Sequence, residues 1–150
     1  VLNSLEQITR WQKETNNAPA ALQIETGMHR LGISLREMEE HHAALSTLNA
    51  ALIISHYACA SDPLHPLNTQ QSDAMRQVKN MFPGIPISLA NSAGIFLSAD
   101  THFDIARPGC ALYGINPTSS ENPMRHVATL SAPILQIRAI AAGATVGGGV

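Results

Sequence analysis

Apolar residues along the first 110 positions alternate between helical and strand-like spacing. Four of them near the start are three residues apart: Leu2, Leu5, Ile8 and Trp11. This spacing predicts a helix over residues 1–15. The next apolar run, over residues 21–24, is short and is followed by Gly27, which is typical of a buried strand.

The same alternation continues downstream. Ser34 and Glu37 stand in the order of a capping box, which predicts that a helix begins there. One face of that helix carries Leu35, Met38, His42, Leu45 and Leu48. Further helices are expected around residues 75–81 and directly after Asn91 and Ser92. Strands are expected over residues 52–56, 85–90 and 103–106, and a loop over residues 62–68, where Pro, Asn and Asp dominate.

Strands that alternate with helices favour parallel pairing through right-handed crossovers, so we predict an α/β fold. In such folds ligand-binding residues gather at the carboxyl ends of the strands. This rule selects four segments: residues 26–30, 55–56, 91–92 and 107–110.

The composition and the apolar pattern of the chain change after residue 118. Residues 118–123 have the composition of a linker, and residues 131–140 have a strand-like pattern of apolar positions. We therefore predict a second domain that begins near residue 121.

Composition narrows the functional classes. Hydrophobic residues make up 45% and charged residues 13% of the chain, which indicates a packed core. The net charge of −2 gives no reason to expect nucleic-acid or membrane partners, and no apolar run is long enough to span a membrane. Cys59 and Cys110 lack a metal-binding spacing and are expected to be reduced thiols.

Each candidate site residue taken alone has an ordinary explanation. His56 after a strand could be a structural hydrogen-bonding group, and the Asn91-Ser92 pair could simply cap a helix. Arg107 belongs to an Arg-Pro-Gly turn. A metal site built on His56 and His65 lacks partners at a suitable spacing, so we expect no metal.

Six segments taken together resemble the alanine racemase family, in its order and at compatible spacing. They are residues 25–32 (ETGMHRLG), 55–58 (SHYA), 62–68 (DPLHPLN) with Gln70 and Gln71, 91–94 (NSAG), 107–114 (RPGCALYG) and 146–149 (VGGG). The resemblance covers nearly the whole chain. Because the chain opens on Val1 and ends on Val150, we expect an internal fragment of such a protein.

The resemblance implies the later part of a (β/α)8 TIM-type barrel over residues 1–120, followed by the first strands of a C-terminal β domain over residues 121–150. It implies pyridoxal 5′-phosphate (PLP) as the cofactor and interconversion of L- and D-alanine as the reaction. It also implies a homodimer in which the partner's β domain completes each site. The setting would be the bacterial cytoplasm, where D-alanine supplies peptidoglycan for the cell wall.

The resemblance assigns roles at the cofactor. Arg107 matches the arginine that faces the pyridine nitrogen, and because an arginine keeps its proton, that nitrogen should stay unprotonated. His56 matches the histidine beside this arginine and is expected to orient it rather than to move protons. Ser92 matches a phosphate-binding serine at a helix start. Gly109 and Cys110 match positions whose backbone N–H groups reach the phosphate.

The resemblance also places residues near the substrate. Arg30 matches an arginine close to the substrate carboxylate, for which a planar fork of donors is suited. Met28 is expected to line the same pocket at the substrate, and Asn91 is expected to line it as a cofactor-binding residue. At the position of Gln23 many family members carry a lysine that can be carbamylated, and a glutamine cannot undergo this modification.

Racemisation needs two acid–base groups on opposite faces of the α-carbon. The family's Schiff-base lysine is expected before Val1, and its catalytic tyrosine should fall where Gly148 stands. We therefore expect this polypeptide alone to be inactive. A non-catalytic PLP-binding barrel protein and a racemase of broad specificity remain alternatives.

Overall fold

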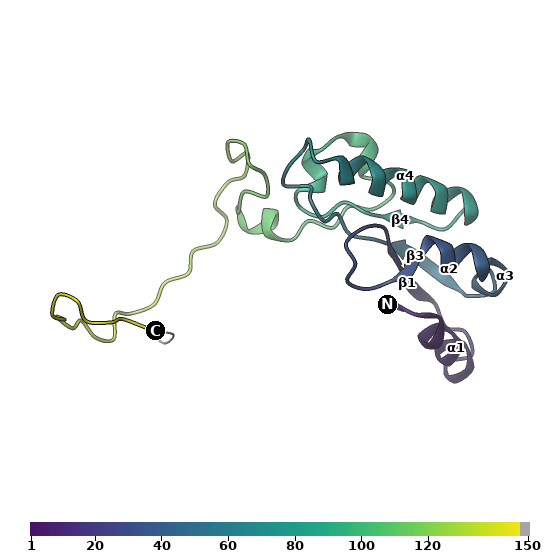
Figure 1. Ribbon diagram of the computed structural model, residues 1–150, viewed down its shortest axis with the longest axis horizontal. Helices are drawn as coiled ribbons and strands as arrows, with labels where there is room; N and C mark the ends of the chain where they lie inside the picture. The colour runs from purple at the N-terminus through teal and green to yellow at the C-terminus, as the bar shows by residue number, and fades with distance from the viewer. Residues whose placement is uncertain (148–150) are drawn as a thin grey trace.

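The computed structural model describes residues 1–147. Its elements are α1 (Leu5–Glu14), β1 (Ala20–Glu25), β2 (Ile33–Ser34), α2 (Leu35–Glu40), α3 (His42–Leu45), β3 (Ala50–Ile54), α4 (Pro66–Met81), β4 (Ile87–Ser88) and the short 3-10 helices η1 (Gly94–Phe96), η2 (Ala99–Thr101) and η3 (Cys110–Tyr113). Figure 1 shows these elements gathered at one end, with the chain beyond η3 running away from them.

The four strands form one parallel sheet in the order β2-β1-β3-β4. Leu22 of β1 lies beside Ile53 of β3, and Ile53 lies beside Ile87 of β4. From β1 the sheet advances in one direction through β3 and β4, and helices lie between these three strands along the chain, as in part of an α/β barrel. The two-residue β2 pairs on the other side of β1. The α/β fold class predicted from the sequence is confirmed.

The core forms between this sheet and the helices that cover it. Its most completely buried side chains come from both layers: Leu22, Ile24, Ile33, Met38, Ile53, Tyr57, Met75, Val78, Ile87 and Leu89. Burial on this scale removes apolar surface from water, which is the main favourable term in folding.

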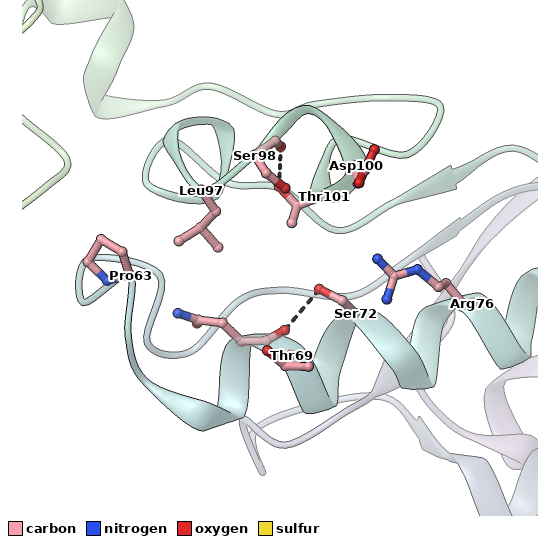
Figure 2. A pocket seen from close by; sticks show the side chains of 9 residues that line it. Pro63, Thr69, Ser72, Arg76, Leu97, Ser98, Asp100 and Thr101 are labelled. Atoms are coloured by element: carbon pink, nitrogen blue, oxygen red, sulfur yellow. Dashed lines mark hydrogen bonds between the residues drawn. The ribbon is translucent and has the colours of Figure 1, made fainter.

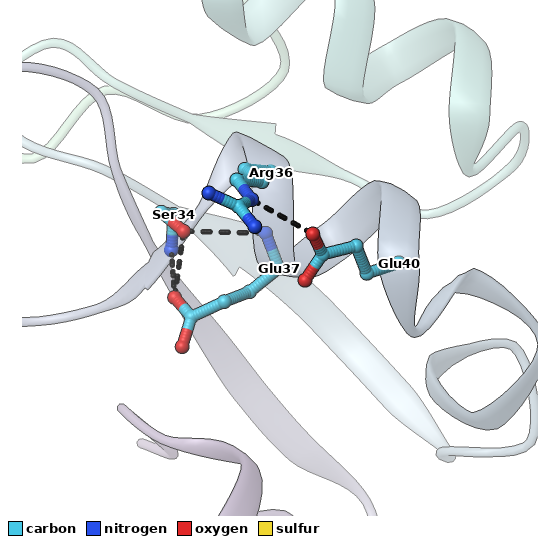
Figure 3. A network of polar contacts seen from close by, with 4 residues as sticks. All are labelled: Ser34, Arg36, Glu37 and Glu40. Atoms are coloured by element: carbon cyan, nitrogen blue, oxygen red, sulfur yellow. Dashed lines mark hydrogen bonds and ion pairs between the residues drawn. The ribbon is translucent and has the colours of Figure 1, made fainter.

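The predicted capping box at the start of α2 is present. The Ser34 hydroxyl oxygen accepts a hydrogen bond from the Glu37 backbone N–H at 3.2 Å, and the Glu37 carboxylate accepts one from the Ser34 N–H at 2.9 Å. Figure 3 shows this pair beside Arg36 and Glu40, which form an ion pair of 2.7 Å on the exposed face. The serine hydroxyl and backbone N–H groups lower the pKa of Glu37 below its ordinary value.

The helix expected to run on through Leu48 divides at His41. That residue has φ −113° and ψ 16°, and α3 begins afresh after it. Leu45 and Leu48 are buried as expected, but His42 is exposed. His42 lies at the margin of the core, where its ring centroid is 5.0 Å from that of the buried Phe82.

Two of the expected strands are shorter or absent. β4 covers only Ile87–Ser88 of the predicted 85–90, and residues 103–106 form no regular strand. Phe103 has a φ of +54°, which interrupts extended backbone. The segment still runs along β4, because the N–H groups of Asp104 and Ile105 both donate to the Ile87 carbonyl oxygen. The loop expected over 62–68 is also shorter, since α4 begins at Pro66, a residue suited to a first helical turn.

The strand predicted over residues 131–140 is absent from the structure. The segment has no regular hydrogen-bonded structure, and its apolar side chains are exposed: Leu130, Ile134, Leu135, Ile137 and Ile140. A strand forms only when a second strand satisfies its backbone groups, and no described segment pairs with this one. The domain division at residue 120 stays a prediction, and Gly148 lies outside the described residues.

Replacement of Ser34 by alanine should lower the free energy of unfolding by about 1 kcal/mol, because it removes the cap of α2. Arg36→Ala is the matched control on the same turn. Its ion pair is solvent-exposed, so its loss should be less than half as large. Chemical denaturation of both variants measures the difference. An equal or larger loss for Arg36→Ala would contradict the assignment.

Candidate functional site

Arg107 occupies the carboxyl end of the sheet. Its guanidinium group donates hydrogen bonds to the Ser88 hydroxyl oxygen and to the Ser55 carbonyl oxygen, and one Nη lies 3.5 Å from His56 Nδ1. Burial lowers the pKa of Arg107 from its ordinary value. An arginine nevertheless keeps its charge in proteins, so a cation is held at the ends of β3 and β4.

His56 lies between two donors. Asn91 Nδ2 is 3.1 Å from His56 Nε2 and also donates to the Tyr57 carbonyl oxygen, while Asn91 Oδ1 accepts from the Gly94 N–H. These contacts fix the asparagine amide, so His56 Nε2 acts as the acceptor and Nδ1 carries the proton of the neutral ring. Burial, followed by the positive charges of Arg107 and Arg30, lowers the pKa of His56 below its ordinary value.

Ser92 follows β4 and is 6% exposed. Its hydroxyl oxygen accepts hydrogen bonds from the backbone N–H of Gly109 at 2.7 Å and of Ala111 at 3.4 Å. The hydroxyl proton therefore remains available to a ligand. A Cβ added at Gly109 would lie 3.8 Å from this oxygen and would take up space directly beside it.

These side chains border a single cavity of about 330 Å³. Its lining consists of His56, Asn91, Ser92, Ala93, Arg107, Gly109, Cys110 and Pro117. All six residues that the sequence analysis selected for cofactor binding are among them. The volume falls within the usual range for a small-ligand site. The half-buried cation of Arg107 and the available proton of the Ser92 hydroxyl are donors that suit an anionic ligand.

Arg30 and Met28 do not line this cavity. Arg30 is exposed, and its backbone N–H points to the Glu25 carboxylate at 3.4 Å. Burial alone would raise the pKa of Glu25, but the backbone N–H groups of residues 27, 29 and 30 hold it below its ordinary value. The backbone of the loop after β1 is therefore bound to the Glu25 carboxylate. The Gln23 side chain makes only a long contact, 3.5 Å from its Nε2 to the Ile24 carbonyl oxygen.

Sequence reasoning gave no role to three residues that support the site from behind. The Ser88 hydroxyl oxygen and the Ser55 backbone carbonyl oxygen accept from Arg107, and Gln71 of α4 contacts the backbone next to His56. The pattern did carry a signal for Gln71. It stands on the apolar face of α4, four residues from both Leu67 and Met75, where a polar side chain needs a partner.

A second cavity, of about 260 Å³, lies between α4 and the η1–η2 region. Figure 2 shows Thr69, Ser72 and Arg76 facing it from α4, with Leu97 and Thr101 opposite. No strand-end residue borders it, and Arg76 is already paired with Asp73 on the surface. Among the described residues no group of three His, Cys, Asp or Glu side chains is placed to hold a metal ion.

The family model for the N-terminal domain of alanine racemase matches residues 1–117. The chain belongs to the alanine racemase family. It is 46% identical to the alanine racemase of Rhodospirillum rubrum over 99% of this chain and 42% of that protein. It is 45% identical to a catabolic alanine racemase of Mesorhizobium japonicum, with 99% and 41% covered. The chain therefore spans about two fifths of the length of these family members.

Solved structures of the family agree. The alanine racemase of Bartonella henselae, described with covalently bound pyridoxal phosphate, superposes with a TM-score of 0.74 at 35% identity, over 83% of this chain and 39% of that one. The biosynthetic alanine racemase of Pseudomonas aeruginosa gives a TM-score of 0.70 at 31% identity, with 81% and 35% covered. Within residues 1–147, no helix has both the length and the apolar character needed to cross a membrane.

The depressed pKa of His56 predicts a pH dependence of stability. As the pH falls below the ordinary histidine pKa of about 6.5, His56 is protonated in the unfolded chain while it stays neutral in the folded chain. The contribution of His56 is therefore complete above about pH 6.5 and is lost as pH falls towards the lower folded pKa. Denaturation of the native protein and of His56→Gln across pH 5–8 isolates it. The native protein should lose stability relative to the variant on acidification, and a flat or opposite difference would refute the assignment.

Proposed function

We propose that this chain is the cofactor-binding part of a PLP-dependent alanine racemase, an enzyme that interconverts L- and D-alanine. The observation that carries the proposal is the half-buried guanidinium of Arg107 in the same cavity as the Ser92 hydroxyl, whose proton remains available to a ligand. Membership of the alanine racemase family supports the proposed reaction, and the pyridoxal phosphate bound in the Bartonella henselae relative supports the proposed cofactor.

The cavity fits the phosphate group of PLP at one end. Ser92 would donate its hydroxyl proton to a phosphate oxygen, and the backbone around Gly109 and Cys110 would approach closely because Gly109 lacks a side chain. Because the contact at Cys110 is to the main chain, its thiol is not needed for binding.

The other end of the cavity fits the pyridine ring. PLP, when bound, would withdraw electrons from the α-carbon of the amino acid and so make its proton removable. Arg107 keeps its own proton and would leave the ring nitrogen unprotonated. His56, neutral and fixed by Asn91, would lie beside Arg107 without exchanging a proton with the substrate, while Ser55 and Ser88 would hold the guanidinium.

Substrate recognition is a further part of the proposal. Arg30 is exposed and follows the carboxyl end of β1, and in a parallel sheet this is the edge at which the cavity residues follow β3 and β4. A guanidinium there would bind the carboxylate of alanine, with Met28 alongside. The two groups that move the proton are proposed to lie in parts of the enzyme outside residues 1–147.

The whole enzyme is proposed to be a cytoplasmic homodimer that provides D-alanine for peptidoglycan. Residues 121–150 would open its C-terminal β domain. The exposed apolar side chains at Leu130, Leu135 and Ile137 support this, because burial in a second domain or against a partner subunit would remove them from water.

Ser92→Ala should weaken PLP binding by about 10- to 100-fold in the full-length protein that carries this sequence, because it removes one hydrogen bond to a charged group. Ser98→Ala is the control, since Ser98 is exposed, lies outside the cavity and makes no side-chain cap. Titration followed by PLP absorbance measures both affinities, and a D-alanine assay follows turnover.

Three outcomes of these measurements separate the candidate functions. Tight PLP binding with D-alanine formation supports the racemase. Binding without turnover of any amino acid would favour the non-catalytic PLP-binding protein, and turnover of several amino acids a racemase of broad specificity. Equal affinity in Ser92→Ala and the native protein would overturn the phosphate site.

A further inference from the structure

Gln71 is a fully buried polar side chain that the proposed function does not use. Its exposed fraction is 0%, and it projects from the face of α4 that packs on the sheet. A buried amide is costly unless its two N–H groups and its oxygen find partners. Gln71 lies between Leu67 and Met75 on this face, so its amide needs hydrogen-bond partners there.

Both N–H groups and the oxygen of the Gln71 amide have hydrogen-bond partners. Nε2 donates to the Thr26 hydroxyl oxygen and to the His56 carbonyl oxygen, each at 2.9 Å. Oε1 accepts from the Ala58 backbone N–H at 3.0 Å. One side chain of α4 therefore joins the segment that follows β1 to two peptide groups that follow β3.

This amide acts on the backbone that carries His56. The peptide groups on either side of Tyr57 are bound to Gln71, while the carbonyl oxygen of Ser55 is bound to Arg107. Thr26 and Ser55 also share a hydrogen bond of 2.7 Å between their hydroxyl groups. The main chain at His56 is thus fixed from the helix layer as well as from the cavity.

We propose that Gln71 is a positioning residue for the proposed cofactor site: it fixes the main chain at His56 and so keeps the imidazole between Arg107 and Asn91. The inference rests on the proposed function for its effect on the cofactor, but its effect on the histidine can be observed without PLP. An apolar side chain of equal length would fill the same volume and would leave the His56 backbone without its partner.

The test uses Gln71→Met in the full-length protein that carries this sequence. Methionine is unbranched and similar in length, so it preserves packing and removes only the hydrogen bonds. Gln70→Met is the matched control, because Gln70 is the exposed neighbour on the same helix. Nitrogen-15 resonances of the His56 ring, assigned with His56→Gln, report the position and the titration of the imidazole. Equilibrium titration gives the affinity for PLP.

We expect the His56 ring resonances to shift in Gln71→Met. Arg107 lies 3.5 Å from the ring, and burial together with the positive charges of Arg107 and Arg30 lowers the pKa of His56. If the ring moves away from them and towards water, its titration midpoint rises towards the ordinary value of about 6.5. PLP affinity should fall about tenfold, and Gln70→Met should match the native protein in every respect.

Unchanged His56 resonances and an unchanged titration midpoint in a folded Gln71→Met protein would overturn the proposal, even if stability fell. Should Gln71→Met not fold, Thr26→Val decides the matter when it is compared with Ser55→Ala. Thr26→Val removes one contact of the Gln71 amide and the hydrogen bond to Ser55, whereas Ser55→Ala removes only the latter. A shift in Thr26→Val beyond that in Ser55→Ala, in the direction expected for Gln71→Met, supports the role, and equal shifts overturn it. If the native protein fails to bind PLP while the His56 resonances still respond to Gln71→Met, the proposed function fails and the positioning role stands.

Discussion

The half-buried guanidinium of Arg107 needs acceptors, and the surrounding structure is arranged to provide them. A charged group taken out of water is costly unless its donors are satisfied. Here the Ser88 hydroxyl oxygen and the Ser55 carbonyl oxygen satisfy it, one at β4 and one directly after β3. The same contacts hold the carboxyl ends of two strands together. Arg107 therefore both gives the cavity its positive charge and connects the strand ends that border it.

The charge of Arg107 also determines what its neighbour can do. A protonated His56 would place a second cation beside the first, and both of its ring nitrogens would then donate towards donors, Arg107 on one side and Asn91 on the other. The neutral ring removes one of these two conflicts, because Nε2 can then accept from Asn91, and it adds no charge beside Arg107. His56 is therefore expected to stay neutral next to the arginine, which Ser55 and Ser88 hold in place.

The sequence was most informative where an interaction is local. The capping box of Ser34 and Glu37 depends on residues three apart, and it forms as predicted. The break at His41 and the positive φ of Phe103 depend on packing that no local pattern encodes. Strand formation over residues 131–140 needs a partner that the described chain does not contain. The cavity residues were found by family resemblance, whereas the exposed position of Arg30 and the contacts of Gln71 needed coordinates.

The central claim is that Arg107 keeps the nitrogen of a bound pyridine ring unprotonated. It is tested most directly by nitrogen-15 NMR of the full-length protein loaded with PLP that carries the label at the ring nitrogen. The account predicts the chemical shift of a neutral pyridine nitrogen across the neutral pH range, because Arg107 does not give up its proton. A shift characteristic of a protonated pyridinium would contradict it.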